Sequence, residues 1–320
     1  MSPRFILAAT LSAHALTCTA VESDTLRKVA DSGRISVGYR MSSVPFSYLA
    51  AAGGPTGFEM EISNAVVAGV KTRLGQPDLK VELLAVTPQN RISLLQNGTI
   101  DIECGSTTNN QARGKAVQFA INHFYTGTRL LVKKNSGIRN WADLAHKKVS
   151  STMGTTNVQM IRRYSRDHGL DFSIELGKEH DDAMLLVDEG RAAAFAMDEV
   201  LLYGLKSNAR NPDDWDVVGD TLQVEPYACM LRRDDPQFQK LVNGVIGNLM
   251  ASGEFEKLYT KWFLSPIPPK AHAAGLPLVD RFYAKWFTAP PNSFTGKMID
   301  LPMSQQLRDN LRVQSDQPAR

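Results

Sequence analysis

The chain has 320 residues and a formal net charge of +3, so it is long enough for two domains and close to charge balance. Its basic residues are spread along the chain, which argues against a nucleic-acid-binding surface. It contains no uninterrupted apolar run of about 18 residues or more, and we therefore expect no transmembrane helix.

The N-terminus has the composition of a secretory signal peptide. Arg4 precedes a mostly apolar run over residues 5–16, and small residues precede a cleavage position near Ala20. A buried N-terminal helix and a lipoprotein signal with Cys18 as the lipidated residue are the alternatives. We interpret residues 1–20 as a signal peptide, which predicts secretion across the inner membrane into the periplasm.

Two cysteines, Cys104 and Cys229, remain after this segment is removed. In an oxidising compartment they could form a disulfide. Both lie on predicted strands, where they could equally be two small buried apolar side chains. The sequence leaves both possibilities open.

In chain order, the hydrophobic patterns predict an α/β fold. The first series has strands over residues 34–40, 79–86, 100–104 and 127–133, with helices over 25–32, from 58 to near 75, and a short one ending at 97–98. A second series has strands over 147–152, 171–176, 191–198 and 214–219, with helices following Thr156, His180 and Glu199. A long strand over 222–232 and helices over 237–251 and 253–263 complete the pattern.

This order predicts one lobe interrupted by another. Residues 21–126 and 223–269 form the first lobe, and residues 127–222 form the second. Two crossing segments, near 126–128 and 220–224, would act as a hinge beside a ligand-binding cleft. Residues 270–320 form a C-terminal tail, in which 282–287 echo the aromatic pattern of 258–263 and predict a second short helix.

The segment 101–113 carries the first candidate site. A strand ends at Gly105, Ser106 and Thr108 then offer hydroxyls and backbone amides, and Arg113 follows early in a predicted helix. Amide dipoles and a guanidinium are suited to a small carboxylate. A polar loop with a solvated arginine would show the same pattern, so this stretch alone does not separate the two interpretations.

Two further arginines stand at positions that favour ligand binding. Arg40 ends the first strand, and open α/β sheets bind ligands beyond the carboxyl ends of their strands. Arg91 lies in the first turn of a helix, where the helix dipole disfavours a cation by roughly 0.3–1 kcal/mol. We expect Arg91 to face an anion.

The second series supplies the other half of the predicted site. Thr156 opens a helix after a glycine-containing turn, which suits either an anion or a plain helix cap. Asp198 ends an apolar strand, where its carboxylate needs a partner such as a ligand ammonium, although it could also cap the next helix. With His180, these residues suit a ligand with two carboxylates and one amine, such as glutamate or aspartate.

Several segments together carry a family resemblance. They are G-Y-R-M-S-S-V-P-F-S (38–47), Q-N-R-I-S-L-L-Q-N-G (89–98), E-C-G-S-T-T-N-N (103–110), G-T-R-L-L (127–131), A-F-A-M-D (194–198) and D-D-P-Q-F (234–238). Over residues 25–269 the chain resembles the periplasmic glutamate/aspartate-binding proteins of ABC uptake systems. The resemblance implies the two-lobed type II periplasmic binding protein fold, with two βα lobes joined by two crossing segments and a cleft between them.

The resemblance also implies roles for the candidate residues. Arg113 is expected to clamp the ligand α-carboxylate with help from Thr108 and Thr156, and Ser106 and Asp198 are expected to accept hydrogen bonds from the α-ammonium.

Arg40, Arg91 and His180 match the cationic group that reads the side-chain carboxylate. Pro88 departs from the family, which commonly has a ligand-contacting serine there, so one polar contact is lost and the balance between glutamate and aspartate could change.

The implied function is that of a monomeric receptor that captures L-glutamate or L-aspartate and delivers it to the membrane permease of an ABC transporter. No metal, organic cofactor or catalytic residue is expected. The rivals are an enzyme on the same fold, resembling a cyclohexadienyl or arogenate dehydratase, and a ligand-sensing module. In an enzyme, only His180 and Asp198 would be available as acid or base.

Overall fold

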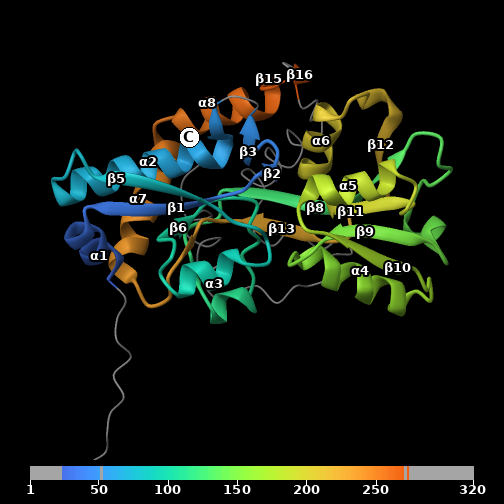
Figure 1. Cartoon of the computed structure of the whole chain (residues 1–320), viewed down its shortest axis with the longest axis horizontal. Coiled ribbons are helices and arrows are strands. Elements are labelled where there is room, and N and C mark those ends of the chain that lie inside the picture. The colour runs from blue at the N-terminus through green and yellow to red at the C-terminus, as the bar shows by residue number, and fades with distance from the viewer. Residues whose placement is uncertain (1–23, 51–52, 270–271, 274–320) are drawn as a thin grey trace, which may run out of the picture.

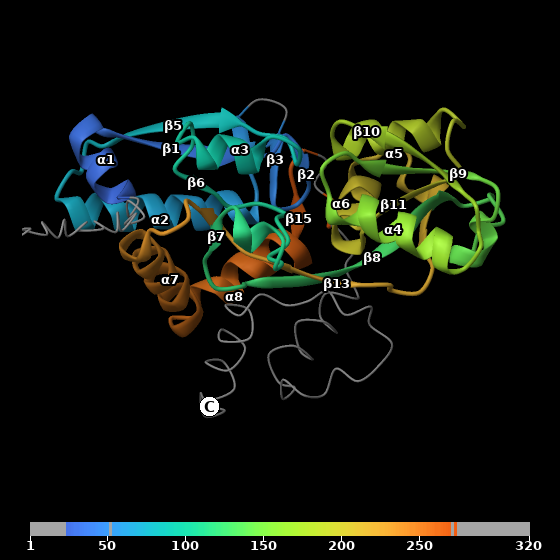
Figure 2. The same ribbon diagram turned by 90° about the horizontal axis from the view of Figure 1, so that it is seen from below.

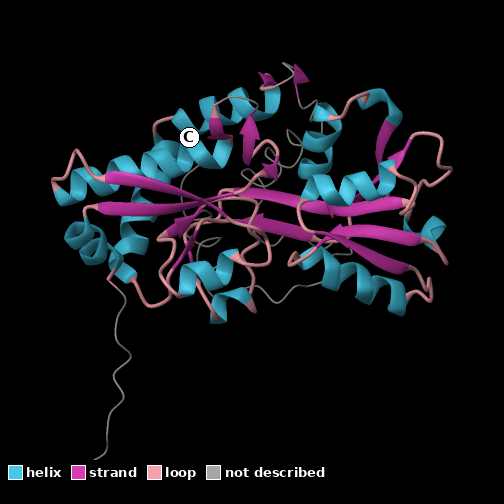
Figure 3. Cartoon of the chain, in the orientation of Figure 1, coloured by secondary structure: helices cyan, strands magenta, loops and turns pink. Residues whose placement is uncertain are grey.

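The computed structural model describes residues 24–50, 53–269 and 272–273. They form two α/β units arranged side by side, each a sheet flanked by helices (Figures 1 and 3). The predicted signal peptide and the predicted helix at 282–287 lie outside the described residues. Within the described part of the chain, no helix has the length and hydropathy needed to cross a bilayer.

Lobe 1 is built on a five-stranded sheet in the order β5-β1-β6-β14-β7. β1 runs parallel to β5 and β6, whereas β14 is antiparallel to β6 and β7. The strands are β1 (Arg34–Tyr39), β5 (Lys80–Ala85), β6 (Ile102–Glu103), β7 (Gln118–Phe119) and β14 (Met230–Leu231), and a small sheet adds β2 (Ser42–Ser43), β3 (Ser47–Ala50) and β4 (Gly54–Thr56).

Helices cover the lobe 1 sheet. They are α1 (Thr25–Ser32), α2 (Phe58–Leu74), α3 (Arg91–Gln96), α7 (Pro236–Ala251) and α8 (Glu254–Tyr259), the last continued by a π-helical turn (Thr260–Leu264). α2 illustrates why the sequence forms these elements. Acidic residues occupy its first turn, basic residues its last turn, and Gly75 ends it in the left-handed conformation.

Lobe 2 is built on the sheet β10-β9-β11-β8-β12. Its strands are β8 (Phe124–Lys133), β9 (Lys148–Thr152), β10 (Ser173–Gly177), β11 (Ala194–Asp198) and β12 (Trp215–Val218), and its helices are α4 (Thr156–Asp167), α5 (His180–Asp188) and α6 (Glu199–Asn208). β9, β10 and β11 are parallel, which directs their carboxyl ends to one edge of the sheet. Every residue of β11 is buried, as its apolar composition predicts.

Apart from the strand that crosses between the lobes, the remaining described elements are three short 3₁₀ segments and one strand pair. They are Arg113–Lys115, Trp141–Leu144 and Pro212–Asp214, with β15 (Pro266–Ile267) paired to β16 (His272–Ala273).

Two strands cross between the lobes. The first part of β8 pairs antiparallel with β13 (Val224–Tyr227), from Phe124 opposite Tyr227 to Gly127 opposite Val224. Figure 2 shows the two strands running side by side from one lobe to the other. The rest of β8 joins the lobe 2 sheet. The predicted crossing near 126–128 overlaps the part of β8 that pairs with β13, whereas the one near 220–224 meets β13 only at Val224.

The predicted long strand over 222–232 is wrong. It is divided into β13 and β14, because β13 pairs with β8 whereas β14 enters the lobe 1 sheet between β6 and β7. The chain changes its pairing partner at Ala228 and Cys229.

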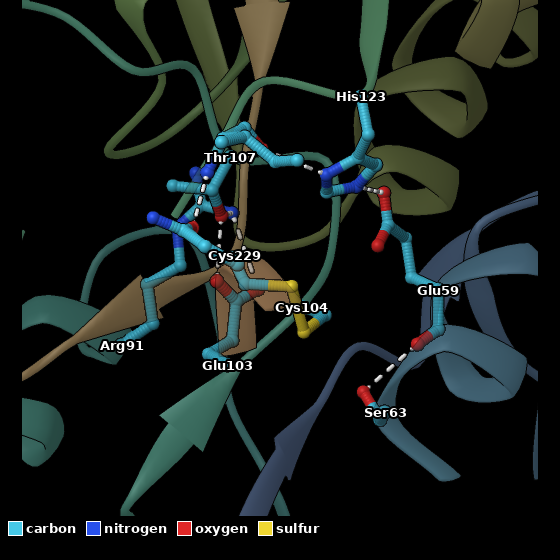
Figure 4. The surroundings of a disulfide bond; sticks show 10 residues. Glu59, Ser63, Arg91, Glu103, Cys104, Thr107, His123 and Cys229 are labelled. Carbon is cyan, nitrogen blue, oxygen red and sulfur yellow. Dashed lines mark hydrogen bonds and ion pairs between the residues drawn. A yellow bond between two sulfur atoms is a disulfide. The ribbon is translucent and has the colours of Figure 1, made fainter. Parts of the chain in front are cut away.

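The two cysteines form a disulfide, which decides between the two possibilities that the sequence left open. Cys104 follows β6 and Cys229 precedes β14, so the bond joins segments 125 residues apart in the chain. Figure 4 shows Glu59 and His123 close by, and their side chains form a buried pair at 2.8 Å. The disulfide thus links the end of β6 to the point where the chain leaves β13 and enters the lobe 1 sheet.

Candidate ligand-binding site

The predicted site residues gather where the carboxyl ends of strands from the two lobes meet. Several contacts cross the seam between the lobes. Arg113 Nη2 donates to the Gly154 carbonyl (3.3 Å), Arg40 Nη2 to Glu179 Oε2 (2.6 Å), and the Thr108 and Thr156 hydroxyl oxygens lie 3.4 Å apart. The structure therefore brings predicted residues of both lobes together at this seam.

Arg113 lies half-buried at this seam. Its Nη1 donates to the Thr108 carbonyl at 3.0 Å, so both of its hydrogen-bond acceptors from the protein are backbone carbonyls. Burial lowers the pKa of Arg113, and the nearby carboxylate of Glu225 opposes that shift. The predicted helix at this position is wrong, because Arg113–Lys115 form a single 3₁₀ turn before the chain enters β7.

Arg91 begins α3 and is buried. Its Nη1 donates to the Ser106 carbonyl (3.2 Å) and to the Thr107 hydroxyl, and lies 3.6 Å from Glu103 Oε1. The expectation that Arg91 faces an anion is met by Glu103, which the sequence analysis did not single out. Burial lowers the pKa of Arg91 to about 9, and Glu103 opposes that effect. The guanidinium stays charged at neutral pH.

Arg40 follows β1 and is fully buried. Besides its ion pair with Glu179, its Nε and Nη1 atoms have no hydrogen-bond partner among the described residues. Buried donors of this kind require an acceptor, and a ligand carboxylate would supply one. Glu179 is held in place by a capping box with Asp182 at the start of α5.

His180 is the first residue of α5 and lies close to Arg40 and Arg91. Its Nδ1 is 2.8 Å from the Thr152 hydroxyl, and its buried Nε2 has no partner within the described part of the chain. Burial and the two guanidinium groups place the pKa of His180 well below its usual value. This shift favours a neutral imidazole for His180, so Arg40 and Arg91 are the cations of this group, and the predicted contact of His180 with the ligand stays a prediction.

Asp198 ends β11 and accepts hydrogen bonds from the Asn157 amide (3.0 Å) and the Tyr227 hydroxyl. Its side chain makes no capping bond to α6, so the capping alternative is not realised. Burial raises the pKa of Asp198, and the two hydrogen bonds oppose this rise. Ser106 bonds instead to the Ser43 hydroxyl at 3.1 Å.

Thr156 does not use its hydroxyl as a helix cap. It donates to the Glu225 carboxylate at 3.0 Å, and the N-cap residue of α4 is Thr155. Gly154, just before it, packs on the backbone of Pro88 and Gln89, where a Cβ would come within 2.6 Å of the Gln89 nitrogen. The Pro88 segment therefore lies directly against the lobe 2 turn.

The sequence analysis counted three arginines, one histidine and one aspartate. The structure adds three buried carboxylates beside them, Glu103, Glu179 and Glu225. The sequence held a signal for two of these carboxylates. Glu103 is a charged residue within a predicted buried strand, and Glu179 directly precedes the predicted site residue His180. The positive charge of the site is consequently balanced in part by the protein itself.

Comparison with known proteins identifies the family. Residues 35–265 match the model of the bacterial extracellular solute-binding proteins, family 3. The chain belongs to this family.

Curated relatives carry names consistent with this family. The chain is 47% identical over 246 residues to the glutamate/aspartate import solute-binding protein of Escherichia coli strain K12, covering 77% of this chain and 82% of that protein. It is 43% identical to an L-glutamate/L-aspartate-binding protein of Pseudomonas aeruginosa strain PAO1, covering 86% and 91%. These relatives are transport proteins and not enzymes.

Solved structures show the same fold. An ancestral amino acid-binding protein described as a precursor of cyclohexadienyl dehydratase has a TM-score of 0.64 and 28% identity, covering 75% of this chain and 99% of that one. An ancestral arginine-binding protein bound to arginine has a TM-score of 0.65 and 26% identity, covering 72% and 98%. The fold is that of the two-lobed type II periplasmic binding proteins, and the chain is a solute-binding protein of the ABC import type.

Proposed function

We propose that this protein captures L-glutamate or L-aspartate between its lobes and delivers it to the membrane permease of an ABC transporter. The observation that carries the proposal is the set of buried nitrogen atoms of Arg40, Arg91 and His180, four of which have no hydrogen-bond partner among the described residues. They are Arg40 Nε, Arg40 Nη1, Arg91 Nε and His180 Nε2. A second carboxylate on the ligand satisfies such a group, whereas an amide matches it less well because its nitrogen is itself a donor.

The proposed ligand places its α-carboxylate at Arg113 with Thr108 and Thr156. Its α-ammonium lies between Asp198 and Ser106, the buried carboxylate and the hydroxyl expected to accept its protons. The glutamate/aspartate names of the relatives, at 43–47% identity, support the same ligand class.

The lobes are proposed to be residues 21–126 with 223–269, and residues 127–222, moving about the β8–β13 crossing. The loaded, closed form is the one that docks on the permease, and the protein acts as a monomer. Residues 1–20 would direct it to the periplasm, where the relatives' import role requires it.

Calorimetric titration of purified, ligand-stripped protein tests the proposal. Glutamate and aspartate should bind with dissociation constants near the micromolar range, about −8 kcal/mol. Glutamine and asparagine should bind at least about 100-fold more weakly, a difference of roughly 2.7 kcal/mol. Absence of heat with both acids would refute the ligand class.

A further inference from the structure

Glu225 is a buried carboxylate on the crossing strand β13, opposite Thr126 on β8. Its Oε2 accepts a hydrogen bond from the Thr156 hydroxyl at 3.0 Å, and its Oε1 accepts one from the Gln223 amide. The Thr108 hydroxyl also bonds to it. Glu225 therefore connects the hydroxyls of both lobes that are proposed to hold the ligand α-carboxylate.

The charged groups around Glu225 act in opposite directions. Asp198 faces it from the end of β11, Tyr227 lies on its own strand, and Arg113 faces it from the 3₁₀ turn. Burial, followed by the charge of Asp198, raises the pKa of Glu225 to about 8, and Arg113 opposes the rise. A ligand carboxylate bound at Arg113 would bring another anion close to Glu225.

The hydroxyl of Thr156 has one proton to donate. When Glu225 is ionised, Thr156 donates that proton to Glu225 and turns a lone pair toward an incoming carboxylate. When Glu225 is protonated, the carboxylic acid donates to Thr156 Oγ1, and Thr156 is free to donate to the ligand. Only the second arrangement stabilises a bound carboxylate through this hydroxyl.

We propose that Glu225 is protonated whenever the ligand α-carboxylate is bound, so that molecules in which it was ionised take up a proton from solvent, and that the protonated side chain turns the Thr156 hydroxyl toward the ligand. This inference rests on the proposed function. No bond of the ligand is made or broken, since the proton passes only from water to the Glu225 carboxylate. Glu225 is a positioning residue that acts through Thr156.

The substitution Glu225→Gln imitates the protonated form. Its amide oxygen can accept from Gln223 while its amide nitrogen donates to Thr156. Between pH 7 and pH 9 the affinity of the unaltered protein for glutamate should fall about tenfold more than that of the variant. This difference excludes the deprotonation of the ligand ammonium, which affects both proteins equally.

Calorimetry at pH 8 in two buffers with different ionisation enthalpies measures the protons taken up. The unaltered protein should take up about half a proton per glutamate, and Glu225→Gln close to none. Glu199→Gln is the matched control, because Glu199 is another buried glutamate with a raised pKa, and its carboxylate pairs with Arg129 and not with Thr156. It should keep the full proton uptake.

Binding without proton uptake in the unaltered protein would overturn the inference while leaving the proposed function intact. Equal uptake by Glu225→Gln would also overturn it and would point to Asp198. If the variant does not fold, the infrared difference spectrum of the unaltered protein decides the matter. Glutamate binding at pH 8 should then produce a new band of a protonated carboxyl group, and absence of that band would contradict the inference. No binding at all would refute the proposed function instead.

Discussion

The two lobes differ in the charged groups that they bring to the seam between them. Lobe 1 supplies the guanidinium groups of Arg40, Arg91 and Arg113. It also carries the carboxylates of Glu103 and Glu225, whereas lobe 2 supplies the carboxylates of Asp198 and Glu179 and no arginine of the predicted site. The contact of Arg40 with Glu179 joins these two sets directly. A ligand that carries both a carboxylate and an ammonium can bridge the lobes in the same way. In the proposed function, the charge interactions that recognise the ligand therefore also hold the two lobes together.

The lobes also differ in how their site residues are held. In lobe 1, Thr107 donates to Glu103 (2.7 Å) and accepts from Arg91, and the adjacent disulfide fastens the same strand. In lobe 2, no disulfide adjoins the site among the described residues, and hydrogen bonds such as that from Asn157 to Asp198 position the side chains. The comparison shows that the arginines of lobe 1 lie beside a covalent cross-link, whereas Asp198 of lobe 2 is held by two neutral partners.

The strongest test of the cationic side is Arg113→Met. We expect glutamate affinity to fall at least about 1,000-fold, roughly 4 kcal/mol, because Arg113 is the guanidinium proposed to pair with the α-carboxylate. Calorimetry measures the loss, and Arg162→Met on the exposed face of α4 is the control. Affinity within a few-fold of the unaltered protein would remove Arg113 from the site.

The anionic side is tested by Asp198→Asn. Glutamate affinity should fall about 100-fold, since the α-ammonium loses its charged acceptor while Asn157 and Tyr227 remain. Glutarate, which has no amine, should be affected far less when it is titrated as a matched ligand. Equal losses for glutamate and glutarate would show that Asp198 acts on the shape of the site and not on the ammonium.

Arg91→Met sharpens the comparison by separating ligand recognition from packing. Binding of glutamate should weaken about tenfold more than binding of glutamine, because only the former has a second carboxylate. The variant should also lose about 3 kcal/mol of stability, since Glu103 is left buried without its cation.

Adding Glu103→Gln to Arg91→Met should restore much of the stability without restoring the preference for glutamate. Thermal denaturation measures the stability, and calorimetry measures the preference for glutamate over glutamine. A preference for glutamate that survives in both variants would assign side-chain recognition to other residues.

The smallest effect on binding is expected for Cys104→Ser with Cys229→Ser. Loss of the cross-link should lower the free energy of unfolding by about 2–5 kcal/mol. Glutamate affinity should change less than about fivefold if Arg91, Thr107 and Glu103 still position the loop. Denaturant unfolding measures the stability and calorimetry the affinity. A large loss of affinity with little loss of stability would show that the disulfide serves ligand binding and not stability.

The sequence predicted the regular elements well because their signals are local. α1 begins and ends where its pattern predicts, and the buried composition of β11 marked it as a central strand. The division of residues 222–232 into two strands escaped detection because it depends on a change of pairing partner. Such a change leaves no periodicity in the sequence.

The candidate site shows the same limit. Residue type and position at the ends of strands or the start of a helix led to the prediction of Arg40, Thr156 and Asp198 as site residues, and the structure places them at the seam between the lobes. The neutral state of His180 arises from burial beside two guanidinium groups, and the role of Glu225 arises from its place on the crossing strand. Both depend on contacts between segments distant in sequence, which no local pattern encodes.

A crystal structure of the complex with L-glutamate tests the central claim most directly. The account predicts the α-carboxylate at Arg113, the ammonium at Asp198, and the side-chain carboxylate within hydrogen-bonding distance of Arg40, Arg91 or His180 Nε2. A side-chain carboxylate directed into solvent, with Arg40 and Arg91 bonded only to Glu179 and Glu103, would contradict it.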